Sequence, residues 1–473
     1  MADTAANKPT ILVPEQPRSL IGGHMRAFFR DRTGFLVRQA KLGDISRFWM
    51  ASQAMYFVNH PDLIRDVFVV NADKFMKGRA LQRTKNLLGN GLLTSEGSEH
   101  LRQRRMIQPA FHRGRIAEYS RSMVEFAGEM MDEWRDGEVR DIDKEMMRLT
   151  LRIVARTLFG ADITDEANRV GRSMTTLVDL FNYLMLPFAE LMEKLPLPHS
   201  IRFKRAKKTL DEIVYGLIAE RRRTGEDNGD LMSMLLAARD DDDGRGMTDE
   251  QVRDEILTLF LAGHETTANA LTWTWMLLSQ NSDVREKLDV EVARVLGQYD
   301  VGADQFDGSG TLPTGRVSVR TPTIDDIPQL AFTEAVIAES MRLYPPAWAI
   351  GRKAISNHEI GGVRVPAGAM VLVSPFVLHR DARFWDQPLE FRPDRWLDQN
   401  IKEASQRNIY FPFGGGVRRC IGEGFAWTEL ILVAATIARR WKLELEPDQR
   451  ISLDPKITLR PKFGMKMHLH RCN

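Results

Sequence analysis

The twelve residues from Phe411 to Gly422 constrain this chain more than any other segment. They read FPFGGGVRRCIG, with three consecutive glycines, two arginines and then Cys420. Glycines permit a tight backbone that can approach a bound group closely. An apolar run over 425–441 follows directly and predicts a helix, so Cys420 would lie near a helix N-terminus and beside two cations. Both features lower the pKa of a thiol and favour the thiolate, the form that binds iron.

Cysteine is scarce in this chain, since Cys420 and Cys472 are its only two cysteines. Two cysteines provide no disulfide framework, and a cytosolic chain usually keeps its thiols reduced. On the loop alone, two other interpretations of Cys420 stay open. It could be a small apolar residue of the core or a redox-sensing thiol.

The composition is that of an ordinary globular protein that can enclose a cofactor. Of 473 residues, 43% are hydrophobic and 27% charged. The 66 Lys and Arg balance 64 Asp and Glu, so we expect no nucleic-acid partner, which needs clustered excess positive charge. Residues 1–20 form an extended segment broken by charges and prolines, which predicts neither a signal peptide nor a membrane anchor. We therefore expect a cytoplasmic protein.

Helical periodicity dominates, and we expect one domain over 1–473, mainly α with a smaller β region. Strand-like runs occur over 48–58 and 359–373, the second with turns at 361–362 and 366–368. Thr248 and Gln251 form a capping box that opens a helix to about residue 279. A second helix, about 328–343, ends before two prolines. The acidic stretch 240–246 should be a polar connection, and 297–322 an exposed loop insertion.

The centre of the long helix reads AGHETT, from Ala262 to Thr267. A glycine inside a helix costs roughly 1 kcal/mol, so Gly263 needs a compensating reason, such as close approach of a flat ligand. Glu265 and Thr266 place a carboxylate and a hydroxyl at one level, and such a pair can relay protons. The alternative is a structural kink in which the hydroxyl bonds back to a carbonyl.

Together these motifs resemble the cytochrome P450 superfamily over most of the chain, in particular its soluble bacterial members. The spacing of Phe413, Gly416, Arg418, Cys420 and Gly422 is that of the family's haem-binding loop. The resemblance implies the cytochrome P450 fold, with haem b held between the long helix and this loop. It makes Cys420 the iron ligand, and Glu265 and Thr266 the acid–alcohol pair, with His264 turned away from the iron.

The resemblance also assigns the other contacts to the haem. Phe413 would pack against the haem and the sulfur, and Ala262 and Gly263 would lie against its other face. Gly422 would also contact the haem, as the last residue of the loop. The propionates would be held by four residues: His100, Arg104, Arg352 and Arg418. For His100 and Arg104, exposure on a surface helix is the alternative.

Glu339 and Arg342 lie three residues apart on the second helix and, with Arg395, resemble the family's structural clamp behind the haem loop. An exposed salt bridge is the alternative for the first two. Trp396 follows where the family more often has phenylalanine, a mild departure that should preserve packing.

Five arginines are predicted to crowd the Cys420 side of the molecule and to attract an acidic redox partner. They are Arg102, Arg105, Arg113, Arg115 and Arg419. We expect a separate ferredoxin or flavodoxin with its reductase, and no fused reductase. Ordinary solvated arginines are the alternative.

The substrate is predicted to be hydrophobic and lipid-like: a fatty acid, a terpenoid or a steroid. The stretch 176–198 has the composition of an apolar lid, although it could equally be core. By resemblance, the cavity wall would include Leu93, Phe181, Phe260, Trp348 and Ile350.

The reaction implied is insertion of one oxygen atom of O2 into the substrate. A peroxygenase or an isomerase on the same fold and a haem gas sensor are the alternatives. The pair of Glu265 and Thr266 disfavours all three. A monomer is the default expectation.

Overall fold

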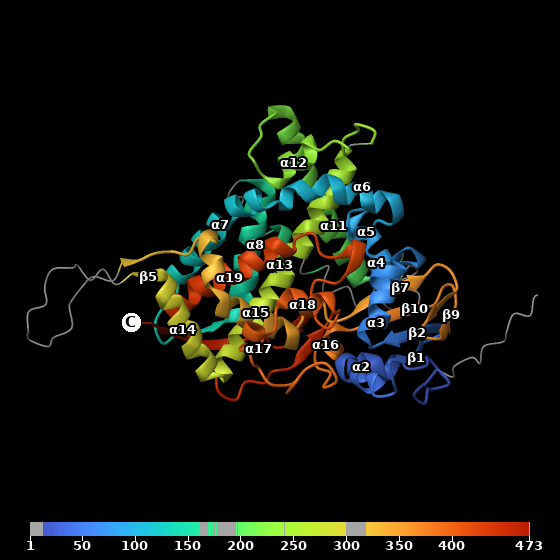
Figure 1. Cartoon of the computed structure of the whole chain (residues 1–473). Helices are drawn as coiled ribbons and strands as arrows, with labels where there is room; N and C mark the ends of the chain where they lie inside the picture. The colour runs from blue at the N-terminus through green and yellow to red at the C-terminus, as the bar shows by residue number, and fades with distance from the viewer. Residues whose placement is uncertain are drawn as a thin grey trace, which may run out of the picture.

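The computed structural model describes residues 13–160, 169–171, 173, 176, 195, 197–240, 242–298 and 318–472. Helices fill most of the molecule, and a smaller β region lies at one side of it (Figure 1). The helices are α1 Met25–Arg30, α2 Arg32–Ala40, α3 Pro61–Arg65, α4 Arg79–Arg83, α5 Lys85–Leu88, α6 Gly97–Ile107, α7 Arg113–Asp132, α8 Ile142–Phe159, α11 Pro198–Thr224, α12 Leu231–Ala237, α13 Asp249–Gln280, α14 Ser282–Leu296, α15 Ala331–Leu343, α16 Pro375–Leu378, α17 Arg395–Asp398, α18 Ile401–Gln406 and α19 Glu423–Arg440.

The strands form one five-stranded sheet and several smaller ones. The large sheet has the order β1-β2-β10-β7-β3, and a three-stranded sheet has the order β11-β14-β4. The strands are β1 Ile45–Met50, β2 Gln53–Val58, β3 Phe75–Lys77, β4 Val139–Asp141, β5 Gly297–Gln298, β6 Ser318–Val319, β7 Ile350–Ala354, β8 His358–Ile360, β9 Val363–Val365, β10 Met370–Val373, β11 Trp441–Leu445, β12 Leu453–Pro455, β13 Leu459–Pro461 and β14 Lys466–Arg471.

The long central helix α13 has 32 residues and begins where the sequence predicts. The Thr248 hydroxyl accepts a hydrogen bond from the Gln251 amide at 3.2 Å, and the Gln251 side chain accepts one from the Thr248 amide at 3.0 Å, which confirms the capping box. The helix is buried on nearly all sides because it is surrounded by the core. It packs most extensively against α8 and also contacts α11, α15 and α19.

The other elements largely follow the predicted pattern. Helices α15 and α19 lie within two or three residues of their predicted bounds. Turns at 361–362 and 366–368 separate β8, β9 and β10 as expected. The run 48–58 differs, because a turn at Ala51 and Ser52 divides it between β1 and β2, which pair antiparallel. Most of the predicted insertion 297–322 and of the lid 176–198 lies outside the described residues.

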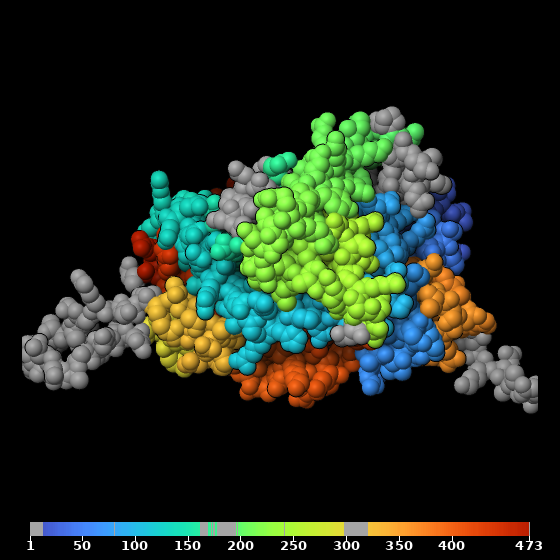
Figure 2. Space-filling model, turned by 90° about the horizontal axis from the view of Figure 1, so that it is seen from above, coloured from blue at the N-terminus to red at the C-terminus, as the bar shows by residue number. Residues whose placement is uncertain are grey.

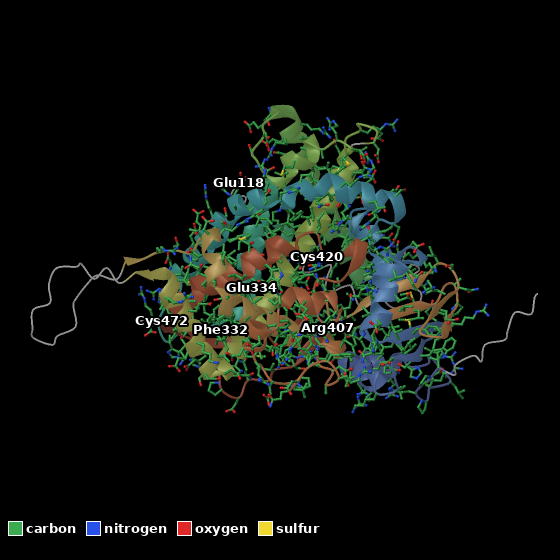
Figure 3. All side chains as sticks on the ribbon, in the orientation of Figure 1. Glu118, Phe332, Glu334, Arg407, Cys420 and Cys472 are labelled. Atoms are coloured by element: carbon green, nitrogen blue, oxygen red, sulfur yellow. The ribbon has the colours of Figure 1, made fainter. Side chains whose placement is uncertain are left out.

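Seen from above, residues 200–250 (green) lie across the α6 and α7 segment (cyan) (Figure 2). In agreement, α12 contacts both α6 and α8. Cys420 lies near the middle of the molecule, whereas Glu118 and Cys472 lie toward its edge (Figure 3). Among the helices of the described residues, none is long and apolar enough to cross a membrane.

Candidate active site

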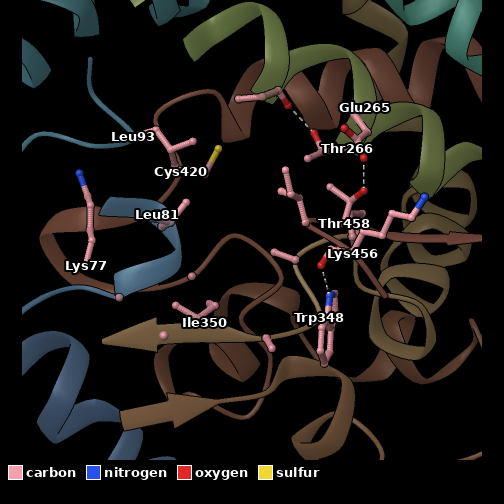
Figure 4. A pocket seen from close by; sticks show the side chains of 18 of the residues that line it. Lys77, Leu81, Leu93, Glu265, Thr266, Trp348, Ile350, Cys420, Lys456 and Thr458 are labelled. Atoms are coloured by element: carbon pink, nitrogen blue, oxygen red, sulfur yellow. Dashed lines mark hydrogen bonds between the residues drawn. The ribbon is translucent and has the colours of Figure 1, made fainter. Parts of the chain in front are cut away.

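A cavity of about 1050 Å³ lies between the Cys420 loop, α13 and the large sheet. Figure 4 shows the Cys420 sulfur on one side of it and Thr266 with Glu265 on another, while Trp348 and Ile350 lie below. Leu93 also lines it. Drug-sized ligands occupy pockets of roughly 300–1,000 Å³, so this cavity has room for a macrocycle and a substrate together.

The backbone of the loop aims Cys420 into the cavity. Gly416 has φ +66°, and a Cβ there would lie 1.8 Å from the Phe68 carbonyl oxygen, so the position requires glycine. The Cys420 amide donates to the Phe413 carbonyl at 3.0 Å, which closes the loop just before α19. Phe413 lines the cavity and packs against Trp427 with ring centroids 5.8 Å apart.

The protein groups around Cys420 do not by themselves lower the pKa of its thiol. Burial raises the pKa of Cys420 to about 11, and the Gly422 amide, Arg104 and Arg419 oppose this only in part. Arg419 is already bonded to Glu423, at 2.5 and 2.6 Å. The thiolate therefore needs the metal, because a coordinated thiol is deprotonated by the ion itself.

A cationic recess opens beside the loop, formed by Lys77, His100, Arg352 and Arg418 around the carboxylate of Glu96, and Glu255 also lies near Lys77. The Arg418 guanidinium donates to Glu96 at 2.5 Å, and its Nη1 is buried with no hydrogen-bond partner among the described residues. Lys77 donates to the carbonyls of Leu92 and Ser95, both at 2.7 Å. Burying so many positive charges is unfavourable without anions.

The pKa values in the recess show the same excess of positive charge. Burial lowers the pKa of Lys77 to about 7 and that of Arg352 to about 10. Burial and the neighbouring Lys77, Arg418 and Arg104 lower the pKa of His100 to about 4, so its imidazole is neutral. Two carboxylates would supply the missing charge, and haem carries two in its propionates. The recess thus fits haem.

Arg104 is less directly placed. Its guanidinium donates to the carbonyl of Arg419 at 2.8 Å and so links α6 to the residue before Cys420. It lies near enough to lower the pKa values of both His100 and Cys420. Its assignment to a propionate stays a prediction.

The centre of α13 lies against the cavity, but Gly263 has a structural reason of its own. A Cβ at Gly263 would lie 2.8 Å from Cγ2 of Val154 on α8, so the close packing of these two helices requires glycine. Ala262 and Gly263 still line the cavity. Close approach of a ligand is therefore not the only explanation for this glycine.

Glu265 is buried, and the β12–β13 hairpin holds its carboxylate. Oε1 accepts hydrogen bonds from Thr458 Oγ1 and from Arg460 Nε, the latter at 2.8 Å. Oε2 is buried without a hydrogen-bond partner among the described residues. Glu265 and Thr458 both line the cavity, so this network lies at its wall (Figure 4).

Thr266 combines the two interpretations that the sequence left open. Its hydroxyl donates to the Ala262 carbonyl at 2.7 Å, the back-bonded arrangement, and its side chain lines the cavity. His264 shares a hydrogen bond of 3.1 Å between Nδ1 and the Phe260 carbonyl and is buried away from the cavity lining. His264 is therefore turned away, as expected.

Glu339, Arg342 and Arg395 come together as predicted, on α15 and α17. Arg342 donates to both carboxylate oxygens of Glu339 at 2.8 and 2.9 Å, and Arg395 donates to one of them at 2.9 Å. The Trp396 indole donates to Glu339 at 2.9 Å, so this departure from the family pattern adds a hydrogen bond. Arg342 also donates to the His379 and Pro388 carbonyls, which leaves the buried network well paired.

Of the five predicted wall residues, Leu93, Trp348 and Ile350 line the cavity. Phe260 does not, because it is fully buried in the apolar core that α13 shares with α8, α11 and α12. Phe181 lies outside the described residues.

The predicted patch of docking arginines is partly neutralised within the chain. Arg102 pairs with Asp240 at 3.0 Å and Arg105 with Asp242 at 2.6 Å, so the acidic connection 240–246 binds them. Arg115 pairs with Glu118 at 2.8 Å. Sequence alone could not reveal these ion pairs, because the partners of Arg102 and Arg105 lie about 140 residues away.

Four site residues were not found from the sequence: Lys77, Glu96, Thr458 and Arg460. Each lies in a short strand, a loop or a hairpin without a recognisable motif. No local pattern marks Lys77, because other basic residues, Lys74 and Arg79, lie close to it in the sequence.

Comparison with known proteins agrees with this geometry. The sequence profile of the cytochrome P450 family matches residues 30–467. Cyclooctatin synthase of Streptomyces melanosporofaciens is 37% identical, over 93% of this chain and 91% of that protein. Cyclooctat-9-en-7-ol 5-monooxygenase of the same organism is 37% identical, over 90% and 88%. Pentalenene oxygenase of Streptomyces avermitilis is 35% identical, over 90% of each.

A mainly helical fold that presents a cysteine to a large cavity, opposite a long helix, defines the class of haem-thiolate enzymes. Within that class, the chain belongs to the cytochrome P450 family. It is a haem-dependent monooxygenase, as its named relatives are. The predicted family and fold are thereby confirmed, and the roles of the individual site residues stay predictions.

Proposed function

We propose that this enzyme uses haem b to insert one atom of O2 into a hydrophobic terpenoid of polycyclic hydrocarbon type. The observation that carries the proposal is the apolar cavity between Cys420 and the pair of Glu265 and Thr266. The names of the relatives support a terpenoid, since they include a cyclooctatin synthase and a pentalenene oxygenase. Haem b, held without covalent bonds, is supported by the sequence, because the only other cysteine is Cys472 and no C-x-x-C-H segment occurs.

The residues that would hold the haem are those of the loop and the recess. Cys420 would bind the iron, and Arg418, Arg352, Lys77 and His100 would bind the propionates. When bound, the haem supplies O2 activation, which thiolate ligation favours.

Side chains of the protein hold and accept protons and exclude water from the cavity. The hydroxyl of Thr266 can hold a proton at the cavity wall, and Oε2 of Glu265 can accept one, since Oε1 is held by Thr458 and Arg460. Leu93, Ile350 and other apolar side chains keep the cavity dry and position a substrate that makes few hydrogen bonds.

The test is a titration of the purified holoprotein with a cyclic sesquiterpene, a cyclic diterpene, a long-chain fatty acid and a steroid. A terpenoid should produce the spin-state shift that follows displacement of water from the iron, at micromolar concentration. A shift caused only by the fatty acid or the steroid would overturn the substrate class. A reduced carbon-monoxide complex without the red-shifted Soret band of thiolate ligation would overturn the role of Cys420.

Electrons would come from an acidic ferredoxin or flavodoxin that binds over the outer face of the Cys420 loop. There a surface hollow of about 700 Å³ is lined by Arg65, Lys402 and Arg419, together with the loop residues 413–416. Glu334, Asp398 and Glu423 also line it, so basic and acidic side chains are equal in number there. The free cysteines fit the cytoplasm, where such partners occur.

Replacement of Arg65 and Lys402 by glutamate should slow reduction by the ferredoxin several-fold at low salt. Replacement of Arg102 by glutamine should change the rate less, because Asp240 already pairs with it. If replacement of Arg102 slows reduction more than replacement of Arg65 and Lys402, the ferredoxin binds at α6 instead.

A further inference from the structure

Two apolar side chains, Leu20 and Ile21, project from the surface next to the cavity. Leu20 is 105% exposed and Ile21 is 91% exposed, whereas no other large apolar residue in the described part of the chain exceeds 74%. A pair of adjacent, fully exposed aliphatic side chains is unfavourable in water unless another surface covers it.

The fold displays this pair through an ordered turn. The amide of Ser19 donates to the Gly23 carbonyl at 3.3 Å, and the amide of Ala51 donates to the Gly22 carbonyl at 3.2 Å. A Cβ at Gly23 would lie 2.7 Å from the Trp49 carbonyl oxygen, so the turn lies directly against β1. Because these contacts fix both ends of the turn, the side chains of Leu20 and Ile21 point into solvent.

Positive charge surrounds the apolar pair. Residues 13–50 contain seven Lys and Arg but three Asp and Glu, although the whole chain is nearly neutral. Arg18, Arg26 and Arg30 have exposed side chains close to the pair in sequence. The acidic Glu15 is shared by Arg18 at 3.9 Å and Arg47 at 2.9 Å. The surface therefore retains a cationic surplus.

The same segment continues into the cavity. Helix α1 follows the turn and has no buried residue, yet Met25, Phe28 and Phe29 are half-buried and line the cavity. The exposed apolar pair and one edge of the cavity therefore belong to one continuous surface.

We propose that residues 18–30 form a docking surface for an anionic lipid bilayer. Leu20 and Ile21 enter the boundary between headgroups and acyl chains, while Arg18, Arg26 and Arg30 bind lipid phosphates. Charge selects this occupant over a second copy of the chain, since two such arginine-rich surfaces repel each other. Binding to lipid stands apart from the proposed function. Only one consequence rests on the proposed function: a lipophilic substrate would enter the cavity from the bilayer.

The test is co-sedimentation of the holoprotein with vesicles of phosphatidylcholine and phosphatidylglycerol. We expect binding that weakens with salt and is nearly lost on phosphatidylcholine alone. The double variant Leu20→Ser/Ile21→Ser should bind at least about tenfold more weakly, as expected for loss of two buried aliphatic side chains. The variant Arg26→Gln/Arg30→Gln should bind several-fold more weakly.

Control variants replace exposed aliphatic and arginine residues at sites away from residues 18–30. Val290→Ser alters an exposed aliphatic residue on α14, and Arg121→Gln/Arg156→Gln removes two exposed charges from α7 and α8. These controls should bind vesicles like the wild type. Each variant should keep the carbon-monoxide spectrum of the wild type, which separates loss of lipid binding from loss of the haem site.

Three results would overturn the proposal. They are absence of binding to anionic vesicles, equal weakening by the control variants, and a dimer in solution that Leu20→Ser/Ile21→Ser dissociates. The last result would assign the surface to a second copy of the chain.

Discussion

Two glutamates on α13, Glu255 and Glu265, are both almost fully buried and lie ten residues apart, yet their surroundings differ. Glu255 accepts a hydrogen bond from the Leu92 amide at 2.9 Å, and its second oxygen has no partner among the described residues. Glu265 is bonded to Arg460 and Thr458. The first carboxyl lies under the loop that carries Leu93, and the second lies at the cavity wall.

The difference shows that burial alone does not make a proton-transfer group. Burial raises the pKa of Glu255 to about 8, so at neutral pH it is mostly a protonated acid that holds a loop in place. For Glu265, Arg460 offsets the cost of burying a negative charge. We therefore assign the proton relay to Glu265 and a structural role to Glu255. Four predictions test this contrast.

The largest effect should come from Arg460→Met. Removing the arginine leaves the Glu265 carboxylate buried without its cation, which costs about 3 kcal/mol or more of unfolding free energy. Urea denaturation of the holoprotein measures this loss. The double variant Arg460→Met/Glu265→Gln should recover most of the stability, because the uncompensated charge is gone. If the double variant is as unstable as the single one, the ion pair is not the reason for the loss.

Next in size is the effect of Glu265→Gln on turnover. An amide cannot pass on a proton, and general acid–base groups contribute about 10²-fold or more. With a terpenoid found by the titration above, product formation should fall about 100-fold. Glu255→Gln should stay within about twofold of the wild type. Equal losses in the two variants would remove the functional contrast between these glutamates.

A smaller effect concerns the pH dependence of stability. Because the folded pKa of Glu255 is raised from 4.5 to about 8, its contribution is full below about pH 4.5 and is lost as the pH rises through 8. Glu255→Gln cannot ionise, so its stability should decline less than that of the wild type between about pH 5 and 8. The difference should be at most about 3 kcal/mol in urea denaturation. The exposed replacement Glu125→Gln is the control and should leave the slope unchanged.

The contrast between the two glutamates could not have been predicted from the sequence. The loop before Cys420, the capping box at Thr248 and the AGHETT centre of α13 are local patterns, since each depends on residues within a few positions. The sequence therefore located Cys420, Glu265 and Thr266. The partners of Glu265 lie more than 190 residues downstream, and only the folded chain brings them together.

The same reason explains what the sequence missed. It showed only ligand approach as a reason for Gly263, because Val154, its packing partner, lies more than 100 residues earlier. The arginines beside Cys420 are visible in the sequence, whereas the enclosure of its sulfur at the cavity wall and the pairing of Arg419 with Glu423 are not. Local sequence shows which charges are near, and the fold decides which of them are already paired.

The smallest effect should separate the hydroxyl of Thr458 from its methyl group. Thr458 donates to Glu265 and accepts from the Asn269 amide at 3.2 Å. Thr458→Ser keeps both hydrogen bonds, so stability should change by less than about 0.5 kcal/mol. Thr458→Val keeps the shape and loses the hydroxyl, which should cost about 1 kcal/mol and raise the share of peroxide relative to product. The ratio of peroxide to product measures the positioning role, because a purely structural residue would alter stability without altering this ratio. An unchanged ratio in Thr458→Val would leave Arg460 as the one described side chain that positions Glu265 for proton transfer.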